Sequence, residues 1–261
     1  MNTQSRNSTQ SPLIQVQGLT AGYNGQNILE NIHFCVYPGE ILVILGGSGC
    51  GKSTLLKHMI GLYKPVAGRV LLWGTDLNEA DDRVREQILK RVGVLFQSGA
   101  LFSSMTLAEN IALPLHEYSS LSREEIDLVV RIKLQMVELA GYENRYPAEL
   151  SGGMRKRAAL ARAMALDPEI LFVDEPSAGL DPVTSADLDA LLLQLNGAFG
   201  TTLIVVTHEL ASIQTIGRRA IMLDRASRGI IAEGDPKFLK DHHPDPRVRA
   251  FFHRRPTLRR Q

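Results

Sequence analysis

The chain has 261 residues, 44% of them hydrophobic and 22% charged, which is enough for one large α/β domain or for a core with a smaller inserted lobe. This ordinary composition excludes a disordered, collagen-like or coiled-coil protein. No apolar run reaches the roughly 18–20 residues that cross a bilayer, and residues 1–12 are polar, so we expect neither a membrane span nor a secretion signal.

Charge is distributed unevenly along the chain. The formal net charge is +1, but residues 236–261 hold eight Lys and Arg against two Asp and Glu, which leaves −5 on everything before them. Such a tail suits anionic lipid headgroups, nucleic acid or an acidic protein face, and the alternative is a merely solvated end. The adjacent Phe251 and Phe252 favour an anchor, because burial of each ring could contribute roughly 1.5–3 kcal/mol.

The N-terminal part of the chain predicts strands. Residues 13–19 and 28–36 have the pattern of short strands separated by turn residues, and we expect an antiparallel sheet from them. Residues 41–45 are a continuous apolar run, followed at once by glycines and a helical pattern, which is the order of a parallel α/β core. Residues 69–73 and 92–96 are further strand candidates.

The middle of the chain carries helix signals only. Thr106 with Glu109, and Ser122 with Glu125, form capping-box pairs that open helices. Gly141 is predicted to close the second helix. These signals therefore predict a helical lobe.

Strand signals return in the last third of the chain. They occur at 170–173, 203–206 and 220–223, and they alternate with helical patterns near 185–195 and 209–216. The prediction is an α/β protein whose parallel core has an N-terminal antiparallel β subdomain and an inserted α-helical subdomain.

These patterns divide the chain into three segments. We expect a flexible start over 1–12, one α/β domain over 13–235 with its helical insertion at about 98–165, and a basic extension over 236–261.

A glycine-rich loop joins the predicted strand 41–45 to the helix after it. It fits the phosphate-loop pattern G-x-x-x-x-G-K-[ST] and consists of Gly46, Gly47, Ser48, Gly49, Cys50, Gly51, Lys52 and Ser53. Glycines let successive backbone N–H groups converge on one anion, and the helix directs its positive end at the phosphates. We expect Lys52 to reach the β- and γ-phosphates of ATP, Ser53 to ligate Mg²⁺ and Thr54 to bond the α-phosphate.

Two adjacent carboxylates end the predicted strand 170–173. In P-loop enzymes an acid at this point holds Mg²⁺, and Asp174 takes that role. Side chains alternate between the faces of a strand, so Glu175 points elsewhere and can orient and deprotonate the attacking water.

The two cysteines, Cys35 and Cys50, are not expected to form a disulfide, and the cytosol is the natural compartment. Cys50 lies in an electropositive loop at a helix start, which favours a reactive thiolate. The alternative is burial of its sulfur behind the loop.

Between the phosphate loop and the acid pair stands the run Leu150-Ser151-Gly152-Gly153-Met154, which opens a helix rich in Arg and Ala. It resembles the LSGGQ signature of ABC ATPases, with Met154 in the last position. The resemblance covers roughly residues 13–235, with every motif in family order. It identifies Gln97 as the Q-loop residue, residues 177–181 as the D-loop and His208 as the switch histidine.

The resemblance implies a dimer in which two copies of the chain face head to tail. Each ATP is held between the phosphate loop of one copy and Ser151, Gly152 and Gly153 of the other, and Asp181 belongs to the same nucleotide site. The family also implies that Tyr23 stacks on adenine, that Gln97 meets Mg²⁺ or water and that His208 contacts the γ-phosphate. The rival zinc motif H-E-x-x-H fails, because position 212 is Ser.

Short stretches of the sequence indicate which type of ABC ATPase the chain resembles. Residues 96–102 and 110–115 and the Met-ending signature look like the ATPases of Mla/Mce phospholipid transport systems. That likeness implies a separate transmembrane permease, STAS-domain and MCE-domain subunits, and a peripheral place on the cytoplasmic face of the bacterial inner membrane. It also implies that the C-terminal extension reaches the neighbouring ATPase subunit.

Two alternatives share the catalytic motifs. One is the ATPase of an importer for an amino acid or other small solute. The other is an ABC protein that acts on ribosomes or DNA, but those usually carry two cassettes, a coiled-coil insertion or zinc-binding cysteines. With one cassette and two cysteines, no nucleic-acid partner is expected.

Overall fold

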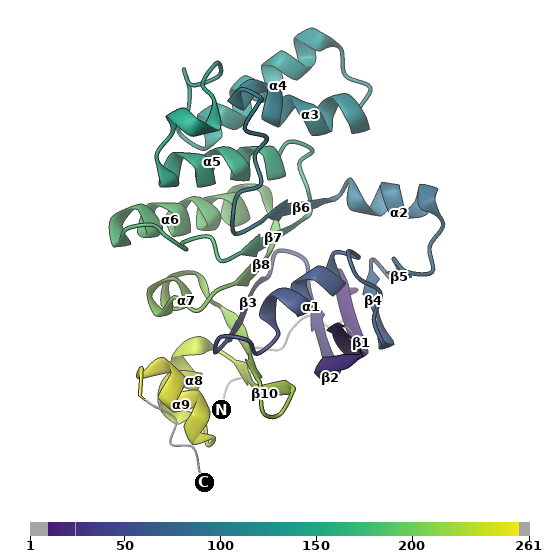
Figure 1. Ribbon diagram of the computed structural model, residues 1–261, viewed down its shortest axis with the longest axis vertical. Coiled ribbons are helices and arrows are strands. Elements are labelled where there is room, and N and C mark those ends of the chain that lie inside the picture. The colour runs from purple at the N-terminus through teal and green to yellow at the C-terminus, as the bar shows by residue number, and fades with distance from the viewer. Residues whose placement is uncertain (1–9, 24, 256–261) are drawn as a thin grey trace.

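The computed structural model describes residues 10–23 and 25–255, and its elements are labelled in Figure 1. Most of the predicted flexible start lies outside the described residues. The strands are β1 (Ile14–Tyr23), β2 (Gln26–Val36), β3 (Ile41–Gly46), β4 (Ala67–Leu72), β5 (Thr75–Asp76), β6 (Val92–Leu95), β7 (Ile170–Asp174), β8 (Thr202–Val206), β9 (Arg219–Asp224) and β10 (Gly229–Gly234). The helices are α1 (Lys52–Met59), α2 (Asp82–Leu89), α3 (Leu107–Tyr118), α4 (Arg123–Met136), α5 (Gly152–Ala163), α6 (Pro182–Phe199), α7 (Leu210–Ile216), α8 (Pro236–His242) and α9 (Pro246–Phe252), with a 3₁₀ turn η1 (Pro147–Glu149).

Two sheets organise the described residues. β1 pairs antiparallel with both β2 and β4 in a four-stranded sheet of order β2-β1-β4-β5. A six-stranded sheet has the order β10-β9-β3-β8-β7-β6, and its neighbours are parallel except for the β10–β9 pair. The predicted α/β fold class with an antiparallel N-terminal sheet is therefore confirmed.

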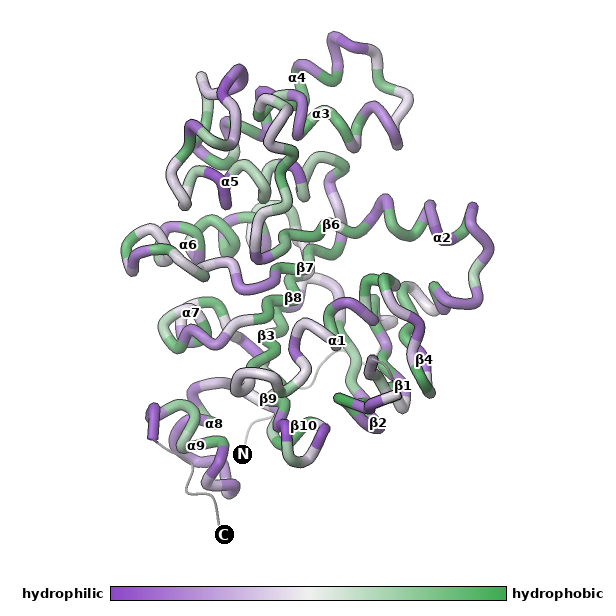
Figure 2. Tube along the Cα trace, in the orientation of Figure 1, coloured by the Kyte–Doolittle hydropathy of each residue, from purple (hydrophilic) through white to green (hydrophobic). Residues whose placement is uncertain are grey.

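The central strands β3, β7 and β8 of the large sheet are buried on both faces, as continuous apolar runs require. Ile41 and Val43 of β3 pack into one hydrophobic cluster with the helices α3 to α9, whereas Leu42 and Ile44 pack into a second cluster with α1 and the antiparallel sheet. Figure 2 shows the result as hydrophobic strands in the middle and a largely hydrophilic α2 at the edge.

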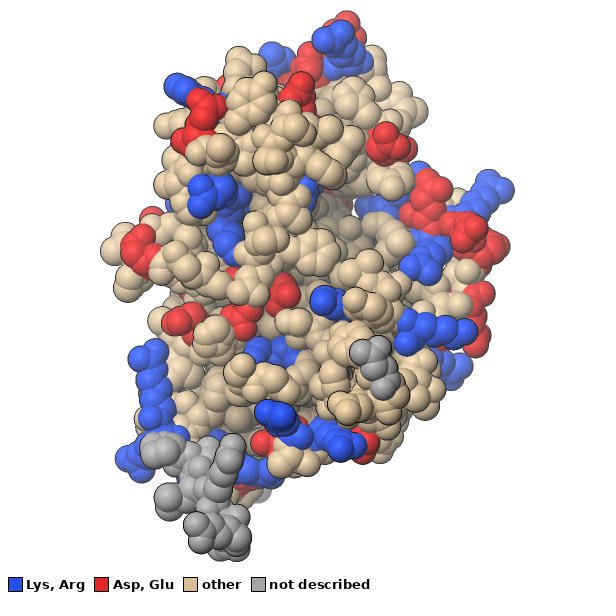
Figure 3. All heavy atoms as spheres, in the orientation of Figure 1, with Lys and Arg blue, Asp and Glu red and all other residues tan. Residues whose placement is uncertain are grey.

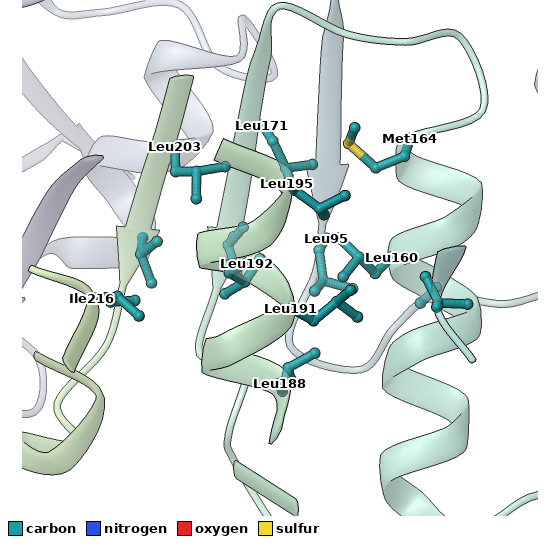
Figure 4. Packing of buried hydrophobic residues seen from close by; sticks show 14 of the residues in the cluster. Leu95, Leu160, Met164, Leu171, Leu188, Leu191, Leu192, Leu195, Leu203 and Ile216 are labelled. Atoms are coloured by element: carbon teal, nitrogen blue, oxygen red, sulfur yellow. The ribbon is translucent and has the colours of Figure 1, made fainter. Parts of the chain in front are cut away.

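Leucines form much of the first cluster. Figure 4 shows Leu171 of β7 and Leu203 of β8 facing Leu192 and Leu195 of α6, with Leu160 of α5 beside them. All five are at most 1% exposed. At roughly 1.5–3 kcal/mol for each buried leucine, this packing fixes α5 and α6 against the face of the sheet formed by β6, β7 and β8.

The helical lobe is built as the capping pairs predict. Thr106 and Ser122 cap α3 and α4, and each makes a complete capping box. The predicted end at Gly141 is wrong, because α4 ends at Met136. Glu138 takes the left-handed conformation there at φ 60°, and the Leu139 amide donates to the Leu134 carbonyl at 2.8 Å. This Schellman-type bond ends the helix without a glycine.

The C-terminal residues up to Phe252 are packed. α8 and α9 begin with prolines after the capping residues Asp235 and Asp245. Phe252 is 4% exposed and belongs to the first cluster, so within the chain it is an anchor to its own core. Figure 3 shows Lys and Arg side chains over this region at the lower left.

Among the described residues, no helix combines the length and the apolar character that crossing a bilayer requires.

Candidate functional site

A cavity of about 610 Å³ opens where four parallel strands end. Gly46 ends β3, and Gln97, Glu175 and His208 come one or two residues after β6, β7 and β8. In open α/β sheets ligands bind outside the carboxyl ends of the strands, as here. The cavity is lined by Ile28, Gly46, Gly47, Ser48, Gly49, Gly51, Lys52, Ser53, Thr54, Gln97, Glu175, His208, Leu210, Phe251 and Arg254.

The predicted phosphate loop forms one wall of this cavity. Gly51 precedes α1 at φ 104°, and a Cβ there would lie 2.7 Å from the Leu29 side chain, so both conformation and space require glycine. Lys52 donates its ammonium to the carbonyls of Gly46 at 2.9 Å and Gly47 at 3.2 Å, which holds the charge over the loop.

Cys50 differs from the expectation of a reactive thiolate. Cys50 is 2% exposed and lies in the second hydrophobic cluster. Burial raises the pKa of the Cys50 thiol, and the nearby Lys52 charge only partly opposes this. The helix start alone therefore predicts the wrong reactivity, because the sulfur points behind the loop rather than into the cavity.

Asp174, the last residue of β7, does not line the cavity in the described part of the chain, whereas Glu175, just after the strand, does. Asp174 is 7% exposed and faces α1, where Ser53 donates a hydrogen bond to it. Burial raises the pKa of the Asp174 carboxyl, the Glu175 charge adds to this, and Lys57 opposes it. Among the described residues, its buried Oδ1 atom has no hydrogen-bond partner.

Glu175 is held beside His208. It has a left-handed backbone at φ 46°, and its amide donates to the Val206 carbonyl at 2.8 Å. The His208 Nδ1 atom lies 2.9 Å from Oε1 and 2.8 Å from Oε2 of Glu175. The Glu175 residue is only 9% exposed, whereas the His208 side chain is 59% exposed.

The signature lies apart from the cavity of its own chain. Ser151 caps α5 and accepts from the Met154 amide at 3.2 Å. A Cβ on Gly153 would lie 2.4 Å from Thr184 Cγ2, so this glycine lets α5 approach the start of α6. In the described part of the chain, Ser151, Gly152 and Gly153 do not line the cavity.

Asp181 caps α6. Its carboxylate accepts from the amides of Val183 and Thr184 at 3.0 Å and from the Thr184 hydroxyl at 2.6 Å. These Thr184 hydrogen bonds lower the pKa of the Asp181 carboxyl. Within the described residues Asp181 does not line the cavity either.

Tyr23 lies at the end of β1 in an aromatic cluster. Its ring packs edge-on against Tyr63 with centroids 5.1 Å apart, and the His58 ring is 6.3 Å away. Of the described residues on this side, Ile28 lines the cavity while Tyr23 does not.

Sequence reasoning missed part of the wall. Ile28 and Leu210 add apolar surface, and Phe251 and Arg254 bring the C-terminal segment to the cavity. The basic, Phe-containing tail is the available signal, but its composition favours a contact with a neighbouring subunit or with lipid.

Taken together, the cavity can hold an anion at its loop and present a carboxylate and an imidazole to it. The model for the family described as "ABC transporter" matches residues 29–178. The Mycobacterium leprae (strain TN) protein named "Probable ribonucleotide transport ATP-binding protein mkl" is 42% identical over 93% of this chain and 69% of its own length. The Escherichia coli (strain K12) "Intermembrane phospholipid transport system ATP-binding protein MlaF" is 39% identical over 92% of this chain and 88% of its own.

Solved structures agree with these relatives. A dimeric structure of the ATP-binding cassette MJ0796, in a post-hydrolysis state with ADP and Pi, has a TM-score of 0.77 and 33% identity over 85% of this chain and 98% of that one. The fold, the assembled cavity and these likenesses lead to one conclusion: the chain belongs to the ABC transporter family and is an ATP-binding, ATP-hydrolysing subunit of that family.

Proposed function

We propose that this ATPase powers phospholipid transport between the inner and outer membranes through a separate permease. The observation that carries the proposal is the likeness to MlaF, which spans 88% of that protein and 92% of this chain. We infer a peripheral place on the cytoplasmic face of the inner membrane, with STAS-domain and MCE-domain subunits as further partners.

In this proposal the phosphate loop holds the triphosphate of ATP. Lys52 contacts the β- and γ-phosphates and Thr54 the α-phosphate, while successive backbone N–H groups of the loop surround them. Tyr23 stacks on adenine, and its packing against Tyr63 supports a fixed ring.

The residues on the β7 side fit Mg²⁺. Mg²⁺ prefers oxygen ligands and is bound through one or two carboxylates together with phosphate oxygens. The Ser53 hydroxyl, the unpartnered Asp174 Oδ1 and the side chain of Gln97 are the oxygens available, and no cluster of three His, Cys, Asp or Glu that could hold a metal occurs in the described residues. When bound, the ion would neutralise charge on the β- and γ-phosphates.

Glu175 acts as the general base in this proposal. Its carboxylate lines the cavity, and a water between it and the γ-phosphate would give up its proton to Glu175 as the oxygen attacks phosphorus. His208 fixes the carboxylate through Nδ1 and turns its other nitrogen to the γ-phosphate.

The complete site is shared between two copies. Since Ser151, Gly152 and Gly153 start a helix with no bulky side chain, they can offer N–H groups to a phosphate held by another copy. Asp181 supports the same interface by capping α6, whose start packs on Gly153. ATP binding then joins the two copies, and hydrolysis releases them.

The test is purification of the tagged chain from membranes together with its partners, followed by mass spectrometry of proteins and lipids. We expect a permease and bound phospholipid, and ATPase activity that phospholipid vesicles stimulate. The control is the Glu175→Gln complex, which should keep its partners and lose the stimulation. Stimulation by ribonucleotides other than ATP instead would favour the function in the name of mkl, and a soluble solute-binding protein among the partners would favour a small-solute importer.

A further inference from the structure

Lys156 is a buried lysine behind the catalytic carboxylate. It lies in α5, the helix that begins at the signature, and is 7% exposed. Its ammonium donates to the Gln97 carbonyl and lies 3.4 Å from the Glu175 carbonyl. Lysines are almost never fully buried without partners, so these two contacts account for its position.

Both carbonyls belong to loops that carry proposed site residues. Glu175 has a left-handed backbone at φ 46°, a conformation that a residue with a side chain keeps only when its surroundings enforce it. Its amide is fixed by the Val206 carbonyl at 2.8 Å, and its carbonyl is fixed by Lys156. The two bonds hold the peptide groups on either side of the Glu175 side chain.

The charge of Lys156 also acts on this site. Burial lowers the pKa of the Lys156 ammonium, and the carboxylates of Asp174 and Glu175 oppose that shift, so the ammonium and both carboxylates interact. The ammonium lies at the backbone of Glu175, and Lys156 is not among the described residues that line the cavity.

A second cation of α5 holds only one of the two loops. Arg162 donates to the carbonyls of Ala100 at 2.7 Å and Gly99 at 3.2 Å, further along the segment that starts at Gln97. Lys156 is thus the α5 residue that joins the Gln97 segment to the Glu175 segment.

We propose that Lys156 is a positioning residue: through the carbonyls of Gln97 and Glu175 it keeps the general base oriented in the cavity and links that orientation to the signature helix α5. The inference rests on the proposed roles of Glu175 and Gln97. A movement of α5, whose first residue follows Ser151, would shift the ammonium and with it the carbonyl of Glu175.

The experiment measures kcat, KM for MgATP, nucleotide affinity and Tm for three variants of the full chain. Lys156→Met removes the charge and all donors at similar length, and Lys156→Arg restores them. Lys133→Met is the matched control, because Lys133 is a lysine of the helical lobe, 5% exposed, whose ammonium pairs with Asp167 instead. Nucleotide affinity is measured in a Glu175→Gln background, where turnover does not interfere.

We expect kcat of Lys156→Met to fall about tenfold or more with nucleotide affinity changed less than about threefold, since misplacing a reacting group costs turnover rather than ground-state binding. Lys156→Arg should recover most of kcat. Lys133→Met should lose a similar amount of Tm and keep kcat within about twofold.

Three results would overturn the inference. They are wild-type kcat in Lys156→Met, a loss of nucleotide affinity that matches its loss of kcat, and an equal loss of kcat in Lys133→Met. If Lys156→Met does not fold, Lys156→Gln keeps a neutral donor and must then show a reduced kcat with normal affinity. Full activity of Glu175→Gln alone would instead refute the proposed base, whatever the Lys156 variants do.

Discussion

The His208 Nδ1 atom lies between both carboxylate oxygens of Glu175, 2.9 Å from Oε1 and 2.8 Å from Oε2. An ionised carboxylate only accepts hydrogen bonds, so Nδ1 must carry the proton. The Nε2 atom is then the nitrogen left to meet a ligand. In the proposed mechanism the His208 ring would thus connect Glu175 to the γ-phosphate.

Replacing His208 separates this connection from nucleotide binding. In His208→Ala, Glu175 loses the partner that orients it, and we expect kcat to fall about tenfold or more while nucleotide affinity changes less than about threefold. ATP hydrolysis and nucleotide titration measure the two quantities. A variant with normal kcat would show that the histidine neither orients Glu175 nor contacts the reacting phosphate.

The shared site makes a prediction about tethered dimers. A Lys52→Ala chain joined to a Ser151→Arg chain should retain activity, because one phosphate loop still faces one intact signature. A wild-type chain joined to a Lys52→Ala, Ser151→Arg double mutant should be inactive, because each site lacks one half. Both dimers contain the same two substitutions, so each is the control for the other. Equal ATPase rates would mean that each chain hydrolyses ATP alone.

Cys50 should be slow to react in the native protein. Its thiol is buried and its pKa is raised by that burial, so little thiolate is available near pH 7. In a Cys35→Ser background, maleimide should label Cys50 at least about tenfold more slowly than after unfolding in urea. Cys35, which is partly exposed, provides the comparison in a Cys50→Ser background. Faster labelling at Cys50 than at Cys35 would contradict the burial.

The C-terminal helix should contribute to stability through Phe252. This ring is 4% exposed in the first hydrophobic cluster, so Phe252→Ala should lower the free energy of unfolding by up to about 3–5 kcal/mol. Phe238 of α8 is 56% exposed, and Phe238→Ala should change it by less than about 0.5 kcal/mol. Urea unfolding compares the two. Similar stabilities for both variants would mean that α9 does not hold to its own core.

The sequence pattern could predict which motifs meet. The phosphate loop and the carboxylates at the end of β7 have fixed spacings, because strand ends and backbone N–H groups must meet one anion, and the structure brings Lys52, Glu175 and His208 to one cavity. The elements α8 and α9 were not predicted. Helices this short are stable only because residues such as Val248 are buried against the core, and the local sequence does not predict that burial.

The environment of single side chains was also not predictable from the local sequence. Lys156 has arginines on both sides in the sequence, a pattern that is typical of a solvent-exposed helix face. Only the packing of α5 against two loops brings its ammonium to the carbonyls of Gln97 and Glu175. Cys50 has the helix start that favours a thiolate, but its burial depends on Gly46 and the neighbouring strand β9, far away in sequence. Glu138 ends α4 in place of the expected Gly141, because tertiary contacts compensate for its left-handed backbone.

The central claim is that Glu175 deprotonates the attacking water, and its most direct test is Glu175→Gln. Glutamine keeps the size of the side chain and a hydrogen-bond acceptor but removes the base. We expect turnover to fall about a hundredfold or more while MgATP still binds, with Lys52→Ala as the contrasting variant that loses nucleotide affinity. Steady-state phosphate release and nucleotide titration on the same preparations measure both quantities. Near-normal phosphate release in Glu175→Gln would contradict the account.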